Sequence, residues 1–371
     1  MFSLLGLPEE ILLLIFSYLD SQALGRLGQV CRRLHHFAGK DAAWRRIARG
    51  CINSGFTQQG ADTVFGISVK ERVKVSQNWR KGRCSRGTLL KWKCNLMPWI
   101  QLDGERLYIS QAKDIRAYQL RSDNNGLHRR PVAIFSAHQD DVCRFVLTNS
   151  HIISGGGDGK IGLHKVHSSG SLQFSAHDQD VNCIDCQGGV IVSGSRDRTA
   201  KVWSFSLGRL GQCLHTIQTE DRVWSVAISP LLSGQLMTCL GTDFLRGAGV
   251  LDVFYETPFT LLSCGYDTYI RYWDLRTSTR KCVMEWEEPH DSALYCMQSD
   301  GNYMIASGSS YYGVVRLWDK RVKNCLHFYS LPSPTSSPVY SLRFSTKCLY
   351  AALASALHVL DFTSTDLQIR S

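Results

Sequence analysis

A histidine, a serine and an aspartate, His177, Ser193 and Asp197, have the residue types of a base, a nucleophile and an orienting carboxylate. The set partly recurs along the chain as His138, Ser154 and Asp158, as Ser263, Asp267 and Trp273, and as His290, Ser307 and Trp318. A catalytic triad is a single convergent site, whereas a set that recurs with each repeat belongs to the architecture of the repeat. The sequence therefore predicts no catalytic residue, and we expect that this protein is not an enzyme.

The 14 cysteines raise the question of a metal site or of disulfides. Cys183 and Cys186 lie three residues apart in a stretch that is predicted to be a strand, so their side chains would point to opposite faces. Cys143 and Cys296 recur at positions equivalent to Cys183, which is typical of small buried apolar groups. Gly155–Gly157 lies within a strand and a turn, not before a helix, so it is no phosphate-binding loop. We therefore expect no metal and no cofactor.

These residues belong to a repeated unit that is clearest at Ala176–Phe205. Runs rich in β-branched residues at 181–186, 190–195 and 199–205 are separated by glycine and aspartate, which predicts an antiparallel meander. One such unit cannot bury its own apolar face, and the pattern recurs from about residue 99 to 362. The unit resembles a WD repeat, one blade of a β-propeller. The resemblance implies that His177, Ser193, Asp197 and Trp203 form a buried hydrogen-bond chain within the blade.

The number of blades can be predicted from their first strands. Seven are expected, at Trp99–Leu102, Val142–Leu147, Val181–Cys186, Val223–Ile228, Val250–Tyr255, Leu294–Gln298 and Val339–Phe344. The interval from Val223 to Val250 is too short for a whole blade, which predicts a seven-blade pattern with the fourth blade incomplete, as in a shortened form of a seven-bladed parent. Gln235–Leu240 would either pair beside the first strand of that blade or take its outer position. Thr88–Cys94 could supply the outermost strand of the last blade.

The first fifty residues predict short helices. Glu9 and Glu10 follow Pro8, a favourable helix start, and residues 11–19 are apolar on almost all sides, so this helix needs cover on more than one side. L-P-E-E-I-L-L-L-I-F-S-Y-L-D at 7–20, V-C-R-R at 30–33 and D-A-A-W-R-R-I at 41–47 resemble an F-box, which would cover residues 3–48. The resemblance implies binding to the Skp-type adaptor that joins F-box proteins to a cullin and a RING protein. A three-helix core without a partner is the alternative.

The resemblance also implies which side chains contact the adaptor. They are Leu7, Pro8, Ile11, Leu12, Ile15, Leu24, Val30, Cys31 and Trp44. If Trp44 packs at the contact, its replacement by alanine is expected to weaken adaptor binding by roughly 2 kcal/mol.

Composition and charge argue against a membrane protein, a secreted protein and a nucleic-acid-binding protein. Hydrophobic residues make up 44% of the 371 residues, and no apolar run is long enough to span a membrane. The N-terminus lacks the basic region and cleavage site of a signal peptide, so we expect a cytoplasmic or nuclear protein with reduced thiols. The formal net charge of +10 lies mostly in residues 1–90, where 14 Lys and Arg face 6 Asp and Glu. A solvated helical surface explains this excess more simply than nucleic-acid binding does.

Two positions of the repeat carry no packing role, the one after the opening residue of the first strand and the one before the turn aspartate. F-box propellers that recognise phosphorylated segments place arginines at these positions, and only Arg196 fits here, with Arg144 and Arg222 near by. Several cationic donors normally converge on a phosphate. The other side chains at these positions are aromatic and suit a peptide bound by stacking and apolar contact; they are Trp224, Tyr266, Tyr295 and Tyr340.

Together these patterns predict an α+β multidomain protein. Residues 1–50 would form a helical F-box domain, 51–87 a linker with a basic helix, and 88–371 an all-β WD-repeat propeller. The order of motifs resembles the F-box/WD-repeat family, which implies the substrate-recognition subunit of an SCF-type ubiquitin ligase, binding a phosphorylated protein substrate, with no nucleic-acid or membrane partner. A propeller scaffold unrelated to ubiquitin is the alternative, and a nucleic-acid binder that uses the basic linker is a second.

Overall fold

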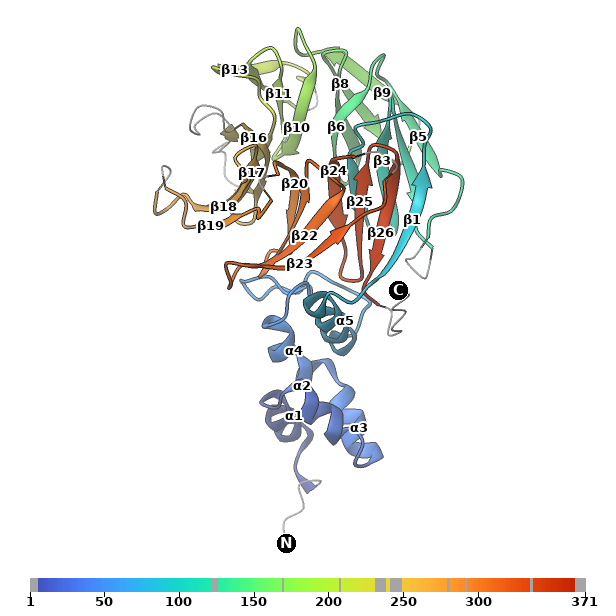
Figure 1. Ribbon diagram of the computed structural model, residues 1–371, viewed down its shortest axis with the longest axis vertical. Coiled ribbons are helices and arrows are strands. Elements are labelled where there is room, and N and C mark those ends of the chain that lie inside the picture. The colour runs from blue at the N-terminus through green and yellow to red at the C-terminus, as the bar shows by residue number, and fades with distance from the viewer. Residues whose placement is uncertain are drawn as a thin grey trace.

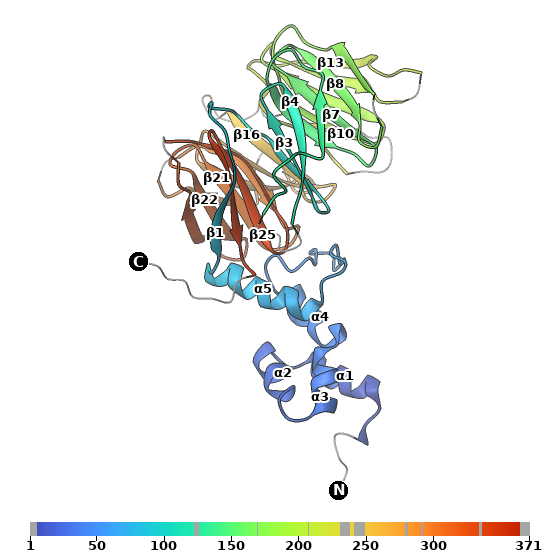
Figure 2. The same ribbon diagram turned by 90° about the vertical axis from the view of Figure 1, so that its right-hand side faces the viewer.

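The computed structural model places a group of helices below a ring of β-sheets (Figures 1 and 2). It describes the chain except residues 1–5, 122–125, 169, 207, 231–237, 241–248, 279–280, 291, 334–335 and 364–371. The helices are α1 (Glu9–Ser17), α2 (Ser21–Leu27), α3 (Arg32–Gly39), α4 (Asp41–Arg49) and α5 (Val69–Lys81). In the described part of the chain, no helix combines the length and the apolar character that crossing a membrane requires.

The helices α1 to α4 share one apolar core. Leu12 and Phe16 of α1 are buried against Trp44 of α4, and the Trp44 Nε1–H donates to the Ala38 carbonyl oxygen at 2.7 Å. The side chain of Asp20 caps α2 by accepting from the Ala23 amide at 2.7 Å. The segment is therefore a small packed module, and its local helix signals agree with the sequence prediction.

The ring contains six four-stranded antiparallel sheets, and each sheet is one blade. Five blades use consecutive strands. These are β2 (Ile100–Asp103), β3 (Arg106–Gln111), β4 (Asp114–Gln119) and β5 (Ala133–Ser136); β6 (Val142–Leu147), β7 (His151–Gly156), β8 (Lys160–Lys165) and β9 (Ser171–Ser175); β10 (Val181–Gln187), β11 (Val190–Ser195), β12 (Thr199–Ser204) and β13 (Cys213–Gln218); β16 (Val250–Tyr255), β17 (Thr260–Gly265), β18 (Tyr269–Asp274) and β19 (Met284–Glu287); β20 (Leu294–Ser299), β21 (Met304–Ser309), β22 (Val314–Asp319) and β23 (Cys325–Ser330).

The sixth blade joins the two ends of the ring. It consists of β24 (Val339–Phe344), β25 (Cys348–Leu353), β26 (Ala356–Asp361) and β1 (Ser85–Lys91), which pairs antiparallel with β26 from Ser85 opposite Asp361 to Lys91 opposite Ala356. The sequence prediction that the stretch after residue 88 supplies the outermost strand of the last blade is confirmed for 88–91. Because the two ends of the propeller share one sheet, opening the ring requires breaking this strand pair.

The predicted number of blades is wrong. The structure has six blades, not seven with an incomplete fourth, because the described residues between β13 and β16 form only a two-stranded sheet of β14 (Val226–Ile228) and β15 (Thr238–Leu240). Of the two predicted arrangements for 235–240, the structure shows pairing beside the first strand, over 238–240. Two strands of three residues bury too little surface to act as a blade.

The strand β14 nevertheless keeps a place in the inner ring, between β10 and β16. Side-chain oxygens accept hydrogen bonds from backbone amides of the following inner strand: Asp185 from Ile228 at 2.7 Å, Ser225 from Val253 at 3.2 Å, Asp252 from Met297 at 3.0 Å, Gln298 from Phe344 at 2.8 Å and Ser341 from Ile100 at 3.3 Å. Two of these bonds attach β14 and its flanking Ser225 to both neighbours. The inner ring is therefore continuous although the blade is missing.

The helix α5 fixes the helical module to the propeller. Ser68 caps its start, and Gly82, at a φ of 68°, ends it in the left-handed region, where a Cβ would lie 2.8 Å from the His327 ring. Trp79 is fully buried, stacks on Phe362 with ring centroids 3.6 Å apart, and donates its Nε1–H to the Thr346 carbonyl at 2.8 Å. The helical module therefore packs directly on the blades formed by β20–β23 and β24–β26.

Candidate interaction sites

The predicted triad residues form a hydrogen-bond chain inside the third blade. His177 Nδ1 lies 2.9 Å from Asp197 Oδ2, His177 Nε2 lies 2.8 Å from Ser193 Oγ, and the Trp203 Nε1–H donates to the same Ser193 oxygen at 2.8 Å. Ser193 is fully buried and His177 nearly so. The chain links β11, β12, the turn between them and the loop that leads into β10, so its role is structural. Trp273 to Ser263 and Trp318 to Ser307 repeat one part of it, both at 2.9 Å.

The blade of β6–β9 departs from this pattern at His164. His138 bonds Asp158 and Ser154 at 3.0 and 2.8 Å, as in the third blade, but His164 stands opposite Ile152 where Trp203 stands opposite Ile191. His164 is buried against the Phe135 ring at a centroid distance of 5.7 Å. Burial lowers the pKa of His164 to about 4, so this imidazole is neutral in the folded protein at neutral pH.

We expect His164 to lower the free energy of unfolding as the pH drops from about 6.5 toward 4. The unfolded chain protonates His164 near pH 6.5, whereas the folded chain does so near pH 4, so the unfolded state binds more protons between these values. Each such histidine contributes about 1.4 kcal/mol per pH unit in this window, and burial lowers the pKa of His177 in the same direction. Urea unfolding at a series of pH values measures the slope, and it should become flatter in His164→Gln. An unchanged slope in that variant would contradict this assignment.

The helix α1 presents an apolar stripe to solvent, which we call the docking face: Ile11, Leu14, Ile15 and Tyr18. These residues are 43%, 55%, 38% and 69% exposed, and their spacing places them on one side of the helix. The opposite side, with Leu12 and Phe16, fills the helical core. Arg46 holds the end of the stripe, because it donates to the Ser17 and Tyr18 carbonyls and lies over the Tyr18 ring. An apolar stripe of this kind marks an interaction surface.

The structure divides the predicted adaptor residues into two groups. The exposed residues are Pro8, Ile11, Ile15 and Val30, and the half-buried ones are Leu7 and Cys31. The core of the helical module buries the remaining three, Leu12, Leu24 and Trp44. The last three support the docking face from beneath, so Trp44→Ala is expected to act first on folding. Sequence reasoning missed Leu14 and Tyr18. Given Ile11 and Ile15, helical spacing places Leu14 and Tyr18 on the same side, although the apolar pattern alone does not show that this side is exposed.

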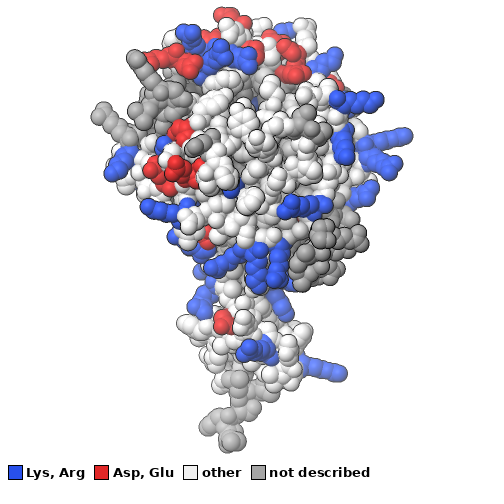
Figure 3. Space-filling view, in the orientation of Figure 1, with Lys and Arg blue, Asp and Glu red and all other residues white. Residues whose placement is uncertain are grey.

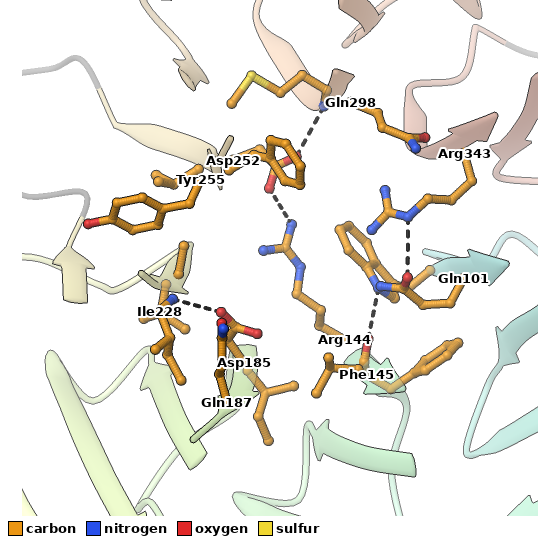
Figure 4. A pocket seen from close by; sticks show the side chains of 18 of the residues that line it. Gln101, Arg144, Phe145, Asp185, Gln187, Ile228, Asp252, Tyr255, Gln298 and Arg343 are labelled. Atoms are coloured by element: carbon orange, nitrogen blue, oxygen red, sulfur yellow. Dashed lines mark hydrogen bonds and ion pairs between the residues drawn. The ribbon is translucent and has the colours of Figure 1, made fainter. Parts of the chain in front are cut away.

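A central cavity of about 490 Å³ runs along the axis of the propeller, lined by side chains from all of its inner strands (Figure 4). Arg144 crosses it from β6: its guanidinium donates to Ser225 Oγ at 3.0 Å and to Asp252 Oδ1 at 2.9 Å, and it lies 3.8 Å from the centroid of the Trp99 ring. Burial lowers the pKa of the neighbouring Arg343 to about 10, so that side chain remains a cation at neutral pH. The cavity wall is thus cross-linked by charged side chains.

The three predicted substrate arginines do not converge. Arg144 is committed to Asp252 inside the channel, Arg196 forms an ion pair with Asp180 at 3.2 Å and lies 5.9 Å from the Trp224 ring, and Arg222 is exposed beside Asp221. Arg144 points into the channel because the strand bulges at Cys143 and shifts its register by one residue. The structure therefore brings together no cluster of cationic donors from these three residues.

The predicted tyrosines, in contrast, do come together. The rings of Tyr295 and Tyr340 lie 5.8 Å apart in a T-shaped arrangement, and the side chains of Tyr295 and Tyr266 share a hydrogen bond. Sequence reasoning missed Tyr311 and Tyr312, which are 59% and 71% exposed in the turn between β21 and β22. The signal was present, because Tyr311-Tyr312-Gly313 replaces the arginine and aspartate that form the equivalent turn at 196–198.

The helical module and the propeller together define the class of protein. Residues 4–50 match the F-box-like family model, and residues 169–204 and 280–319 match the model for the WD domain, G-beta repeat. The chain belongs to the F-box/WD-repeat family: it is 66% identical over 379 residues to F-box/WD repeat-containing protein 4 of Homo sapiens, covering 96% of this chain and 92% of that protein. That relative is also called dactylin, the family member that the order of motifs suggests. The predicted family is confirmed.

More distant comparisons agree with this assignment. The chain is 24% identical over 213 residues to the probable E3 ubiquitin ligase complex SCF subunit sconB of Talaromyces stipitatus, over 55% of this chain and 29% of that protein. The WD40 propeller domain of Doa1 superposes with a TM-score of 0.60 at 17% identity, over 77% of this chain and 98% of that chain, which shows the fold alone. The alignment with the human relative is longer than this chain, so that relative has residues without a counterpart here.

Proposed function

We propose that this protein is the substrate receptor of an SCF-type cullin–RING ubiquitin ligase and performs no bond chemistry itself. The docking face on α1 would bind the Skp-type adaptor, and through it the cullin and the RING protein, while the propeller binds a protein substrate. The observation that carries the proposal is an apolar stripe left exposed on a helix whose other side already fills a complete core. The likeness to the more distant relative sconB, a probable SCF ubiquitin ligase subunit, supports it.

The junction at α5 gives this role a mechanical basis. Trp79, Asn78 and His327 link the helix to the propeller, with Asn78 donating to the Phe362 carbonyl at 2.7 Å and a His327 ring nitrogen 2.7 Å from the Arg80 carbonyl. A rigid junction holds a bound substrate at a defined distance from the ligase and so raises its effective concentration there. We place the protein in the cytoplasm or nucleus, where free thiols such as those of its described cysteines persist.

A triple variant, Ile11→Ala with Leu14→Ala and Tyr18→Ala, is expected to weaken adaptor binding more than about 100-fold, because aromatic and aliphatic anchors at an interface each contribute about 1–2 kcal/mol. Titration of the purified adaptor by calorimetry measures the loss. The matched control replaces three exposed apolar residues of the propeller, Val132, Leu172 and Phe328, by alanine and should bind as the wild type does.

The alternative is a propeller scaffold unrelated to ubiquitin, whose helices only cap the domain. In that case the wild-type protein would not capture the adaptor at micromolar concentration, although its thermal melting would be normal.

The second alternative is a nucleic-acid binder, which would use the basic surface that lies where the propeller meets the helices (Figure 3). Two arginines near this junction have structural partners, since Arg72 is buried in an ion pair with Asp62 and Arg321 donates to the Gly50 carbonyl.

A further inference from the structure

Five tyrosines form a patch on the face of the propeller that lies away from the helices. We call them the tyrosine patch: Tyr266, Tyr295, Tyr311, Tyr312 and Tyr340. Tyr295 and Tyr340 lie at the start of β20 and β24, whereas the helical module contacts the turns that follow these strands, at Asp300 and Thr346. A strand of six residues spans about 17–20 Å, so the two surfaces lie on opposite faces of the ring.

The turn that carries Tyr311 and Tyr312 has a left-handed backbone conformation. Tyr312 has a φ of 58°, the left-handed region that bulky residues avoid, and its side chain is 71% exposed. A left-handed φ also occurs at Ala112, Arg198 and Thr268, in the turns between the second and third strands of three other blades. The backbone conformation therefore belongs to the turn, and what distinguishes this blade is the pair of exposed tyrosine rings.

The rest of the same face is acidic. Three successive loops, which lead into β6, β10 and β14, carry Asp140, Asp141, Asp178, Asp180, Glu220 and Asp221. Three arginines on the same face, Arg196, Arg198 and Arg222, offset only half of these six carboxylates. The face therefore combines exposed aromatic rings with an excess of carboxylates.

We propose that this face binds a substrate segment rich in lysine and arginine, a proposal that rests on the receptor role above. Cations are attracted to tyrosine faces by about 0.5–1 kcal/mol each at exposed sites, and the carboxylates of the three loops add long-range attraction. Burial raises the pKa of Tyr295 to about 12, so its hydroxyl stays neutral and able to donate. A phosphorylated segment would meet more carboxylates than arginines on this face, and Arg196 is already paired with Asp180.

The test uses the full-length protein and three matched fluorescent peptide mixtures. All have the same uncharged positions, and the remaining positions are lysine, glutamate or phosphoserine. Fluorescence anisotropy should show the lysine mixture binding at least about tenfold more tightly than the other two, a difference of about 1.4 kcal/mol, and this preference should shrink in high salt. Tighter binding of the phosphoserine mixture, or no preference at all, would overturn the proposal.

A double variant tests the tyrosine patch separately. Tyr311→Ala with Tyr312→Asn should weaken binding of the lysine mixture about fivefold to tenfold, since asparagine tolerates the left-handed backbone and the fold is kept. Phe328→Ala, at an exposed position on β23, is the control and should bind as the wild type does. If the double variant binds the lysine mixture as tightly as the wild type does, the tyrosine patch is excluded as the binding site. Adaptor binding is measured on the same samples. If the wild-type protein does not bind the adaptor, the receptor role is contradicted, whereas the peptide result is unaffected.

Discussion

Trp79→Ala is expected to lower the free energy of unfolding by about 3–5 kcal/mol, the range for deleting a large buried aromatic side chain. Trp79 is fully buried, stacks on Phe362 and donates to the Thr346 carbonyl at 2.8 Å. Its loss opens a cavity between α5 and the last blade and leaves that carbonyl without its partner. Urea denaturation followed by far-ultraviolet circular dichroism measures the change.

The same substitution should loosen the helical module from the propeller. We expect amides of α5 to exchange with solvent faster in Trp79→Ala, while amides of β10–β12, on the far side of the ring, keep their protection. Trp79→Phe is the matched control: it keeps an aromatic ring against Phe362 but loses the hydrogen bond and part of the ring volume, so about 1–3 kcal/mol should be lost. Equal stability of the alanine variant and the wild type would show that the junction does not depend on this side chain.

The sequence predicted the inner strands well because a short apolar run bounded by turn residues has few other ways to fold. All seven predicted first strands lie at or within a few residues of an observed strand, from Ile100 in β2 to Val339 in β24. The blade number was harder to predict, since it depends on what surrounds each inner strand. After β14 the chain forms only the short β15 within the described residues, so a first strand is present without a blade.

The interaction residues were harder to predict than the fold, for two physical reasons. The helix α1 is apolar on nearly all sides, so its pattern cannot distinguish Ile11 and Leu14, which are exposed, from Leu12, which is buried. In β6 a bulge at Cys143 changes which residue points into the channel, and strand periodicity alone cannot reveal it. The contact of Trp79 with Thr346 joins parts of the chain 267 residues apart, which no local pattern encodes.

Asp252→Ala is expected to destabilise the propeller by about 3–5 kcal/mol, because it leaves the buried Arg144 without its carboxylate. Asp252 accepts from Arg144 at 2.9 Å and from the Met297 amide at 3.0 Å, so it connects β6, β16 and β20 across the channel. Of these strands, β16 directly follows the segment that has no complete blade, and Arg144 also bonds Ser225, which precedes β14. We therefore expect amides of β14 and β16 to lose protection first in hydrogen exchange.

The expected loss of stability in Asp252→Ala is caused by the unpaired charge of Arg144 and not by the missing side chain itself. A second substitution can separate these two causes. Combining Asp252→Leu with Arg144→Met removes both charges and should recover much of the stability that Asp252→Ala loses, as replacement of buried ion pairs by apolar residues often does. Asp180→Ala, which removes a more exposed pair with Arg196, is the control and should cost less than about 1 kcal/mol. If Asp252→Ala unfolds at the same urea concentration as Asp180→Ala, the ion pair of Arg144 with Asp252 does not hold the ring together. The hydrogen bonds of the Ile228 and Val253 amides to Asp185 and Ser225 must then close it alone.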